Sequence, residues 1–218
     1  MKKYLFFFCC LLTAMAGTET LAQSSDVFKN IVVKAKFQQS PVYQVNNYSN
    51  SNQSGYEWLV LNITYFTPKT NEPWLDDVSI EVEILFPADY QGKSVMAQVT
   101  GKTTYWSVEM NGKNHQEIMV VPPEIFRRYT RGGSISISKT QVAGRLIFYS
   151  KSRSILGGAY FEANQKLGVK DLAGLFGKYS SPVSNSLKIE NMILSRDKSP
   201  WANIQYDFYD LIKPETKK

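Results

Sequence analysis

Residues 78–86 read VSIEVEILF, and this stretch gives the clearest indication of the fold. Apolar side chains occupy every second position, with Ser79, Glu81 and Glu83 between them. Because successive side chains of a strand point to opposite faces, the alternation predicts a β-strand with one buried face. Glu81 and Glu83 fall together on the other face, so we interpret them as solvated charges rather than as a catalytic carboxylate pair.

Two segments nearer the N-terminus extend this pattern. Residues 31–37 alternate in the same way, which predicts a second strand with one buried face. Residues 57–66 are apolar on both faces, with Leu59, Leu61, Ile63 and Tyr65 on one and Trp58, Val60 and Phe66 on the other. Such a strand is central in its sheet, or its second face meets another layer or another chain. A helical insertion over that second face is one explanation, and a subunit contact is the other.

Further strands are predicted at residues 94–99, 102–108, 117–121, 134–138, 142–150 and 187–194. Short strands separated by turn residues, without regular alternation of strand and helix, are typical of an all-β sandwich. A single curved sheet packed on helices is the competing architecture.

Short helices are predicted at two places. Residues 122–129 begin with two prolines and Glu124 and end with two arginines, which suits the two ends of a helix. Residues 169–176 carry leucines at helical spacing, and Gly177 follows as a candidate C′ residue. Both helices are interpreted as connections that cover the core.

The N-terminus is typical of an export signal. Lys2 and Lys3 precede an apolar run, residues 4–16, that is shorter than a membrane span. Cleavage sites fit after Ala16 and after Ala22, and we prefer the second because a polar stretch then begins the mature chain. Residues 1–22 are therefore predicted to be a signal peptide, and the protein is expected in the periplasm, at the outer membrane or on the cell surface.

Residues 23–218 are predicted to form one domain, because roughly 195 residues suit a single globular unit. The alternative is two domains divided near residues 150–158, where Lys, Arg, Ser and Gly cluster. Removing Lys2, Lys3 and Glu19 takes the formal charge from +6 to +5. This excess is mild and contains no dense basic block, so nucleic acid is not an expected partner. No second apolar run of spanning length follows, so we expect at most peripheral membrane contact.

Residues suited to catalysis or metal binding are scarce. Cys9 and Cys10 both lie in the signal segment, so no disulfide is expected in the mature chain. His115 is the single histidine and follows the turn-like residues 111–114, so we interpret it as an exposed loop residue. One histidine without cysteine is too few for a typical zinc site. Neither a Gly-x-Ser-x-Gly elbow nor a glycine-rich phosphate loop occurs. We therefore predict no catalytic, cofactor-binding or metal-binding residue, although paired carboxylates need no linear motif.

Aromatic and amide side chains provide candidate contact surfaces. Most aromatic residues of a β domain are buried, and the alternative is an interface or a platform for stacking sugars. Residues 44–55, QVNNYSNSNQSG, are predicted to be a polar loop that suits adaptable contacts. The predicted interaction surface consists of Trp58, Val60, Phe66, Tyr105, Trp106, Trp201, Tyr206 and Tyr209.

The order of these features resembles a known family. An export signal leads an all-β domain with the strand at 78–86, the proline-led helix at 122–129 and a closing segment, SPWANIQYDFYDLIKP, at 199–214. This layout resembles the Ig-like proteins encoded beside type IV pilus genes in verrucomicrobial-type bacteria. The resemblance implies an immunoglobulin-like β-sandwich with two short helical insertions, located at the outer membrane or pilus. It carries over no site residues, and the chain lacks the core cysteine pair of antibody domains.

Three functions follow from these observations. The first is a non-enzymatic structural or assembly component of the envelope associated with type IV pili, with envelope or pilus proteins as partners. The second is a surface module that binds glycans or proteins in adhesion, and the third is a hydrolase whose carboxylates have no linear motif. The absence of catalytic motifs favours the first. Self-association through the second face of residues 57–66 is a separate expectation, with a homo-oligomer as its product.

Overall fold

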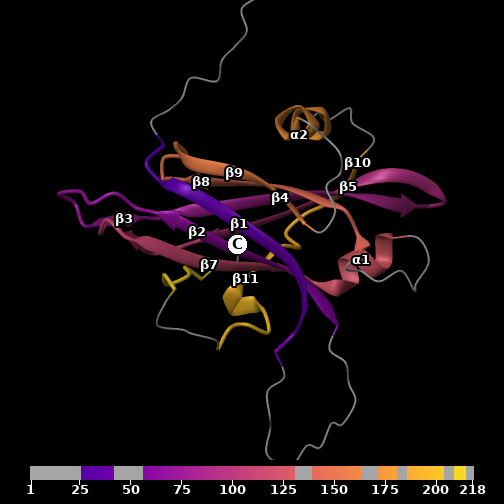
Figure 1. Cartoon of the computed structure of the whole chain (residues 1–218), viewed down its shortest axis with the longest axis horizontal. Helices are drawn as coiled ribbons and strands as arrows, with labels where there is room; N and C mark the ends of the chain where they lie inside the picture. Colours follow the sequence, from indigo (N-terminus) through magenta and orange to yellow (C-terminus); the bar gives the residue numbers. More distant parts are fainter. Residues whose placement is uncertain are drawn as a thin grey trace, which may run out of the picture.

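The computed structural model describes residues 26–41, 56–130, 139–163, 171–180, 186–203 and 209–214. The chain in these ranges is mainly β-strand (Figure 1). The strands are β1 (Lys29–Gln39), β2 (Glu57–Phe66), β3 (Trp74–Asp76), β4 (Ser79–Tyr90), β5 (Lys93–Thr104), β6 (Ser107–Glu109), β7 (Asn114–Val121), β8 (Val142–Tyr149), β9 (Ile155–Ala163), β10 (Ser186–Ile189) and β11 (Leu194–Ser195). The helices are α1 (Pro123–Tyr129) and α2 (Leu172–Ser180), and a 3-10 turn spans Arg196–Lys198.

Two sheets lie face to face. The four-stranded sheet has the order β1-β2-β7-β11, the five-stranded sheet has the order β10-β5-β4-β8-β9, and β3 pairs with β6 in a separate ribbon. Strand pairing is antiparallel except between β10 and β5. This confirms the predicted all-β sandwich with two short helices and contradicts the competing single sheet. The immunoglobulin-like detail stays a prediction.

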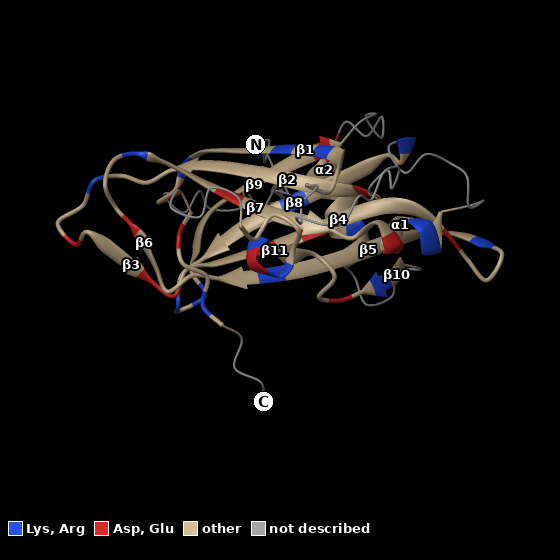
Figure 2. Cartoon of the chain, turned by 90° about the horizontal axis from the view of Figure 1, so that it is seen from below, with Lys and Arg blue, Asp and Glu red and all other residues tan. Residues whose placement is uncertain are grey.

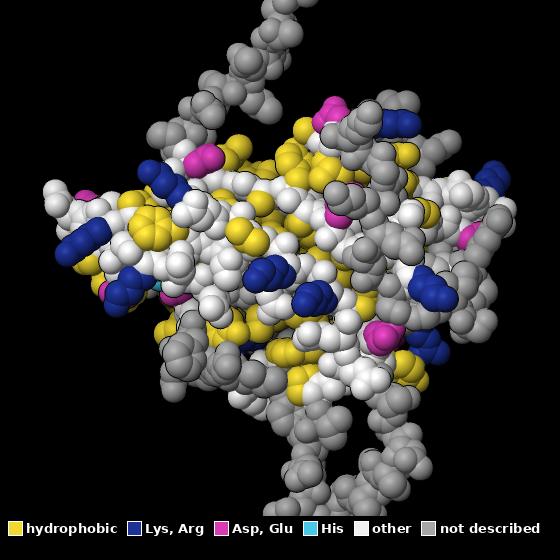
Figure 3. Space-filling model, viewed as in Figure 1, with side chains coloured by type: hydrophobic (Ala, Val, Ile, Leu, Met, Phe, Trp, Pro, Cys, Tyr) yellow, Lys and Arg dark blue, Asp and Glu magenta, His cyan; other side chains and the backbone are white. Residues whose placement is uncertain are grey.

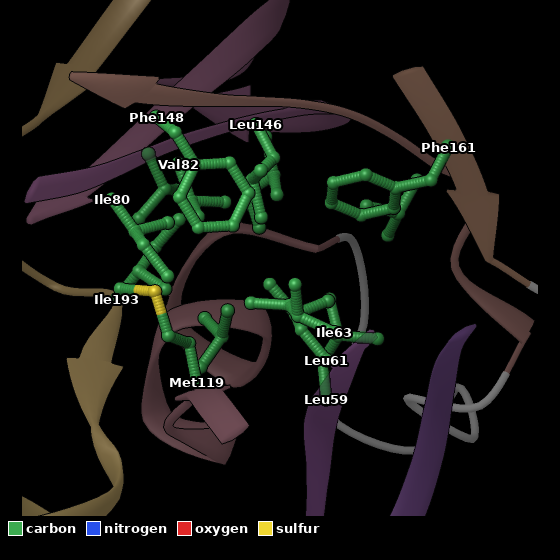
Figure 4. Packing of buried hydrophobic residues seen from close by; sticks show 14 of the residues in the cluster. Leu59, Leu61, Ile63, Ile80, Val82, Met119, Leu146, Phe148, Phe161 and Ile193 are labelled. Atoms are coloured by element: carbon green, nitrogen blue, oxygen red, sulfur yellow. The ribbon is translucent and has the colours of Figure 1, made fainter. Parts of the chain in front are cut away.

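The core lies between the two sheets, and period-two patterning places it there. Leu61 and Ile63 of β2 point toward Val82 and Leu146 of the five-stranded sheet (Figure 4), and all of them are almost completely buried. Burial of apolar surface contributes about 25 cal/mol per Å². The alternation that predicts these strands is therefore the pattern that stabilises the sandwich.

The two helices cover different parts of the sandwich. Phe126 of α1 packs between Phe37 and Phe86, with ring centroids 5.1 and 5.0 Å away. Phe176 of α2 packs on Leu85 and Ala143, on the outer face of the five-stranded sheet (Figure 1). Leu85 is the residue that breaks the alternation of 78–86, and the helix above it explains why an apolar side chain lies on that face.

Helix α2 also corrects one prediction. Gly177 is not a C′ residue, because the helix continues through it to Ser180. The continuation lets Tyr179 pack beside Phe176 and Leu85. A glycine inside a helix costs only about 1 kcal/mol relative to alanine, and this packing offsets the cost.

A crossover joins the two sheets between β10 and β11. The backbone N–H groups of Met192 and Ile193 both donate to the carbonyl oxygen of Thr100, at 2.9 and 3.1 Å. Ile193 then enters the core (Figure 4). A Cβ atom on Gly101 would lie 2.1 Å from the carbonyl oxygen of Ile193. The crossover therefore needs glycine at position 101.

The opposite edge of the sandwich is held by contact between β1 and β9. The Phe28 N–H donates to the Leu156 carbonyl oxygen at 2.8 Å. Gly157 has φ +156, and a Cβ atom there would lie 2.9 Å from the Phe28 carbonyl oxygen. The backbone at Phe28, directly before β1, and the backbone at Gly157 of β9 therefore approach closely because residue 157 has no side chain.

Several strand boundaries differ from the sequence-based expectations. Two strands are expected at 94–99 and 102–108, but the structure has one long strand, β5, followed by the short strand β6. Strand β5 is continuous because its hydrogen-bonded pairing with β4 runs without interruption through Gly101. The strand expected at 187–194 is divided into β10 and β11 by the crossover. Residues 74–76 form the short strand β3, which pairs with β6.

Strand β9 is not predicted from the sequence, because Gly157 and Gly158 interrupt its apolar pattern. The alternative domain boundary at residues 150–158 contains the turn between β8 and β9 and the start of β9. The signal peptide, the polar loop and the strand expected at 134–138 lie outside the described residues.

Candidate functional site

The apolar second face of β2 is covered by the C-terminal part of the chain. Val60 is completely buried and packs in one cluster with Ile118, Val120 and Trp201. The rings of Trp58 and Trp201 meet edge to face, with centroids 5.9 Å apart. The segment after the 3-10 turn covers this face of β2, and neither α1 nor α2 does. The prediction that a helical insertion covers the face is therefore wrong. β2 is central in its sheet, as one of the two alternatives predicts.

The other members of the predicted interaction surface are dispersed. Tyr105 is buried, Trp106 is 52% exposed, and Phe66 and Tyr209 are half-buried. Tyr206 lies outside the described residues. The structure therefore does not unite the eight predicted residues in one exposed surface.

Residues 209–214 form a strap, here called the C-terminal strap, that crosses the end of the sandwich. Ile212 forms a β-bridge with Tyr105, and the Lys213 N–H donates to the Thr104 carbonyl oxygen at 2.7 Å. The Lys213 ammonium pairs with Asp77 and lies 4.6 Å from the centroid of the Trp106 ring. These bonds fix the strap against residues 104–106.

A cluster of polar side chains lies under the strap. The Tyr65 hydroxyl donates to Asp210 Oδ2 at 3.0 Å, and His115 Nδ1 lies 3.3 Å from the same oxygen. His115 Nε2 lies 3.1 Å from Thr67 Oγ1, and the imidazole stacks on the Tyr65 ring. The interpretation of His115 as an exposed loop residue is wrong. The predicted turn at 111–114 is shorter than expected, because β7 already begins at Asn114, and His115 is the second residue of that strand.

The order Thr67–His115–Asp210 has the layout of a nucleophile, base and acid. Thr67 is 0% exposed, and its hydroxyl donates to the Glu109 carbonyl oxygen at 2.9 Å. The single hydroxyl proton is thus directed away from His115, and a substrate has no access to the oxygen. This geometry suits a structural clasp between the strap and β7 rather than nucleophilic catalysis.

Glu117 is the most deeply buried carboxyl group of this end of the sandwich. Neither of its carboxylate oxygens has a hydrogen-bond partner among the described residues. Burial raises the pKa of Glu117 well above its ordinary value, and the charge of Asp210 raises it further. The charge of Arg196 lowers the pKa but only partly offsets this rise. Burial therefore favours the protonated, neutral form of the Glu117 carboxyl in the folded protein.

Replacing Glu117 with glutamine should stabilise the protein increasingly as the pH rises above 4.5. The unfolded chain ionises Glu117 near the ordinary pKa of 4.5, whereas the raised pKa lets the folded protein hold the proton to higher pH. Folding must then take up a proton, and stability falls with rising pH until the folded-state pKa is reached. We expect the variant to exceed the wild type in Tm at pH 8 by on the order of 5 °C.

Thermal unfolding at pH 4.5 and pH 8 measures this difference. Glu72→Gln is the matched control, because the side chain of Glu72 is exposed, and it should change Tm equally at the two pH values. If Tm changes between pH 4.5 and pH 8 by the same amount in Glu117→Gln and in the wild type, the Glu117 carboxyl is not held neutral.

A groove, here called the outer groove, lies on the outer face of the five-stranded sheet. Its volume is about 270 Å³, and its lining includes Glu81, Glu83, Thr100, Lys102, Arg145 and Tyr149. Glu83 Oε2 lies 2.5 Å from Arg145 Nη2, and Gln98 Nε2 donates to Glu83 Oε1 at 2.5 Å. Glu81 pairs with Arg153 and with Lys102, the latter at 3.4 Å. The predicted solvated carboxylates do share the outer face, but both are ion-paired and Glu83 is buried.

Partial burial acts to raise the pKa of Glu81, but Arg153 and Lys102 outweigh it, and the net pKa is lowered. Glu81 is therefore an anion held by two cations. Elsewhere, lysines, arginines and carboxylates are interspersed over the described surface (Figures 2 and 3). Charge alone does not mark a binding face.

No group of three His, Cys, Asp or Glu side chains that could hold a metal ion occurs in the described part of the chain. Within the same residues, neither helix has the length and apolar character needed to cross a membrane.

Comparison with known proteins gives a family and a fold. A protein-family model matches residues 19–216. The chain belongs to the family that this model describes. A search of curated proteins found no match.

Solved structures include a similar fold. A crystal structure of a protein from Akkermansia muciniphila matches with a TM-score of 0.61 and 13% identity, covering 85% of this chain and 94% of that one. The sporulation control protein Spo0M from Bacillus subtilis has a TM-score of 0.30 at 9% identity, covering 62% of this chain and 49% of that one, which is too low to bear on the fold. The chain thus shares its fold with this protein from Akkermansia muciniphila, and the immunoglobulin-like and type IV pilus parts of the predicted resemblance stay predictions.

Proposed function

We propose that this protein is a non-enzymatic component of the bacterial envelope or cell surface with a structural or assembly role, associated with type IV pili. The observation that carries the proposal is the sealed clasp of Thr67, His115 and Asp210. The arrangement most similar to a catalytic triad is inaccessible and fastens the C-terminal strap instead. The predicted signal peptide is what supports the envelope location.

A contact surface for partners is available at the β3–β6 ribbon. This ribbon lies at one end of the molecule (Figure 2), and Trp74, the first residue of β3, is 55% exposed. Trp106, the residue directly before β6, is the exposed one among those members of the predicted interaction surface that the structure describes. Tryptophan is enriched where proteins bind one another, since it supplies a large contact area. Envelope or pilus proteins are the partners that we propose for it.

A second candidate function is adhesion by binding of glycans. The outer groove favours it, because the groove presents fixed hydrogen-bonding groups beside an aromatic ring. The two functions need different surfaces of the molecule.

Deletion of the gene in its native host tests the proposal. We expect altered surface filaments or reduced adhesion, with no loss of glycosidase, peptidase or esterase activity. The wild-type gene should restore the phenotype, and a gene encoding Trp74→Ala with Trp106→Ala should restore it poorly. Unchanged surface structures together with the loss of an enzymatic activity would contradict the proposal.

A further inference from the structure

We propose that the outer groove is a binding site for a neutral carbohydrate. This inference rests on the second candidate function, for which it assigns the site and the class of ligand. It is independent of the proposed contact through the β3–β6 ribbon.

The shape of the outer groove comes from neighbouring positions on three strands. Thr100 of β5 lies opposite Glu83 of β4, which lies opposite Arg145 of β8. Asn191 of the crossover borders the groove on one side. On the other side Ile147 lies opposite Gly158 of β9, which adds no side chain. The volume of about 270 Å³ is near the lower end of the range for small-ligand sites.

The hydrogen-bonding groups of the groove are held in place before a ligand arrives. Each of the two carboxylates is bound by donors from neighbouring strands or turns, Glu83 by Gln98 and Arg145 and Glu81 by Lys102 and Arg153. The Arg145 guanidinium also lies 5.3 Å from the ring centroid of Phe176 in α2. Groups fixed in this way lose little conformational entropy when a ligand binds.

The charges of the lining residues balance, and one further cation, Arg153, pairs with Glu81 from outside the lining. Two carboxylates, Glu81 and Glu83, face two cations, Lys102 and Arg145. An anionic ligand would meet the carboxylates and a cationic ligand would meet the ammonium and guanidinium groups, so neither is favoured. A neutral sugar carries hydroxyl groups that both donate and accept, and it can use both kinds of partner.

Apolar surface accompanies these polar groups. Ile147 and the half-buried ring of Tyr149 line the same groove, and the Arg153 guanidinium lies over one face of that ring, 4.2 Å from its centroid. Sugars present C–H faces that pack on such surfaces, and an aromatic side chain offers an apolar body with a polar end. A second hollow of about 160 Å³, lined by Gln98, Lys188 and Glu190, adjoins the groove at Thr100. A glycan of more than one residue can therefore extend across β5.

The test uses the full mature chain on an array of neutral, sialylated and sulfated glycans, followed by calorimetry with the strongest neutral glycan. Thr100→Val removes a hydroxyl at nearly constant volume and should weaken binding about tenfold. Ile147→Trp fills the groove and should abolish binding. Thr64→Val, on the outer face of the four-stranded sheet, is the matched control and should bind as the wild type does.

Each variant is first compared with the wild type by circular dichroism and Tm, and only folded variants are scored. Binding of neutral glycans that both groove variants weaken and Thr64→Val preserves would support the site. The absence of binding to any glycan, binding unaffected by Ile147→Trp, or preference for sulfated or sialylated glycans would overturn it. Such a failure leaves co-purification with envelope proteins unaffected, so the structural proposal is tested separately.

Discussion

Replacing Trp201 with alanine should destabilise the protein by about 3–5 kcal/mol, the cost of truncating a buried aromatic side chain. Trp201 is 5% exposed and covers Val60, Ile118 and Val120 on the second face of β2. Its removal would also leave these apolar side chains facing solvent. We therefore expect Tm to fall by on the order of 10 °C and self-association to appear.

Thermal unfolding and light scattering over a range of protein concentrations check both effects. Trp74→Ala is the matched control, because Trp74 is exposed and its truncation should change stability by about 0.5 kcal/mol or less. If Trp201→Ala keeps the wild-type Tm and mass, the C-terminal segment does not protect the second face of β2.

Replacing Gly101 with alanine should have the second large effect, a loss of about 3 kcal/mol. The added Cβ would collide with the Ile193 carbonyl oxygen, a backbone atom that cannot rotate away. The crossover would have to shift, and Ile193 would leave the core. Since 1 kcal/mol corresponds to about 2–4 °C in a domain of this size, Tm should fall by about 6–12 °C.

Gly177→Ala separates this collision from a general effect of losing glycine. No atom lies within 4 Å of a Cβ at position 177, and the residue lies inside α2. Alanine there should leave stability unchanged or raise it by up to about 1 kcal/mol. Equal destabilisation by Gly101→Ala and Gly177→Ala would contradict the crossover geometry.

Much of the fold could be predicted because each of the two sheets buries its inner face, which places an apolar residue at every second position of the strands. The strand at 57–66 is confirmed with its boundaries unchanged, since its two apolar faces distinguish it from a loop. Strand β9 could not be predicted, because Gly157 is required by contact with Phe28, which lies more than a hundred residues earlier. Local sequence patterns do not contain information of that kind.

Less of the candidate site could be predicted. Asp210 meets Tyr65 and His115 across separations of 145 and 95 residues, and no spacing rule joins them. One signal was available. His115 and Glu117 have the same parity as the buried Met119 in β7, so continuing the alternation toward the N-terminus would have placed both on the inner face.

Recovery of the protein from detergent-solubilised envelopes of its native host shows whether it belongs to a larger assembly. We expect defined envelope or pilus proteins to co-purify with the wild type and to be reduced in the Trp74→Ala, Trp106→Ala double variant. The same preparations should show no glycosidase, peptidase or esterase turnover. Recovery of the protein alone, with turnover that a single Asp or Glu substitution abolishes, would contradict the account.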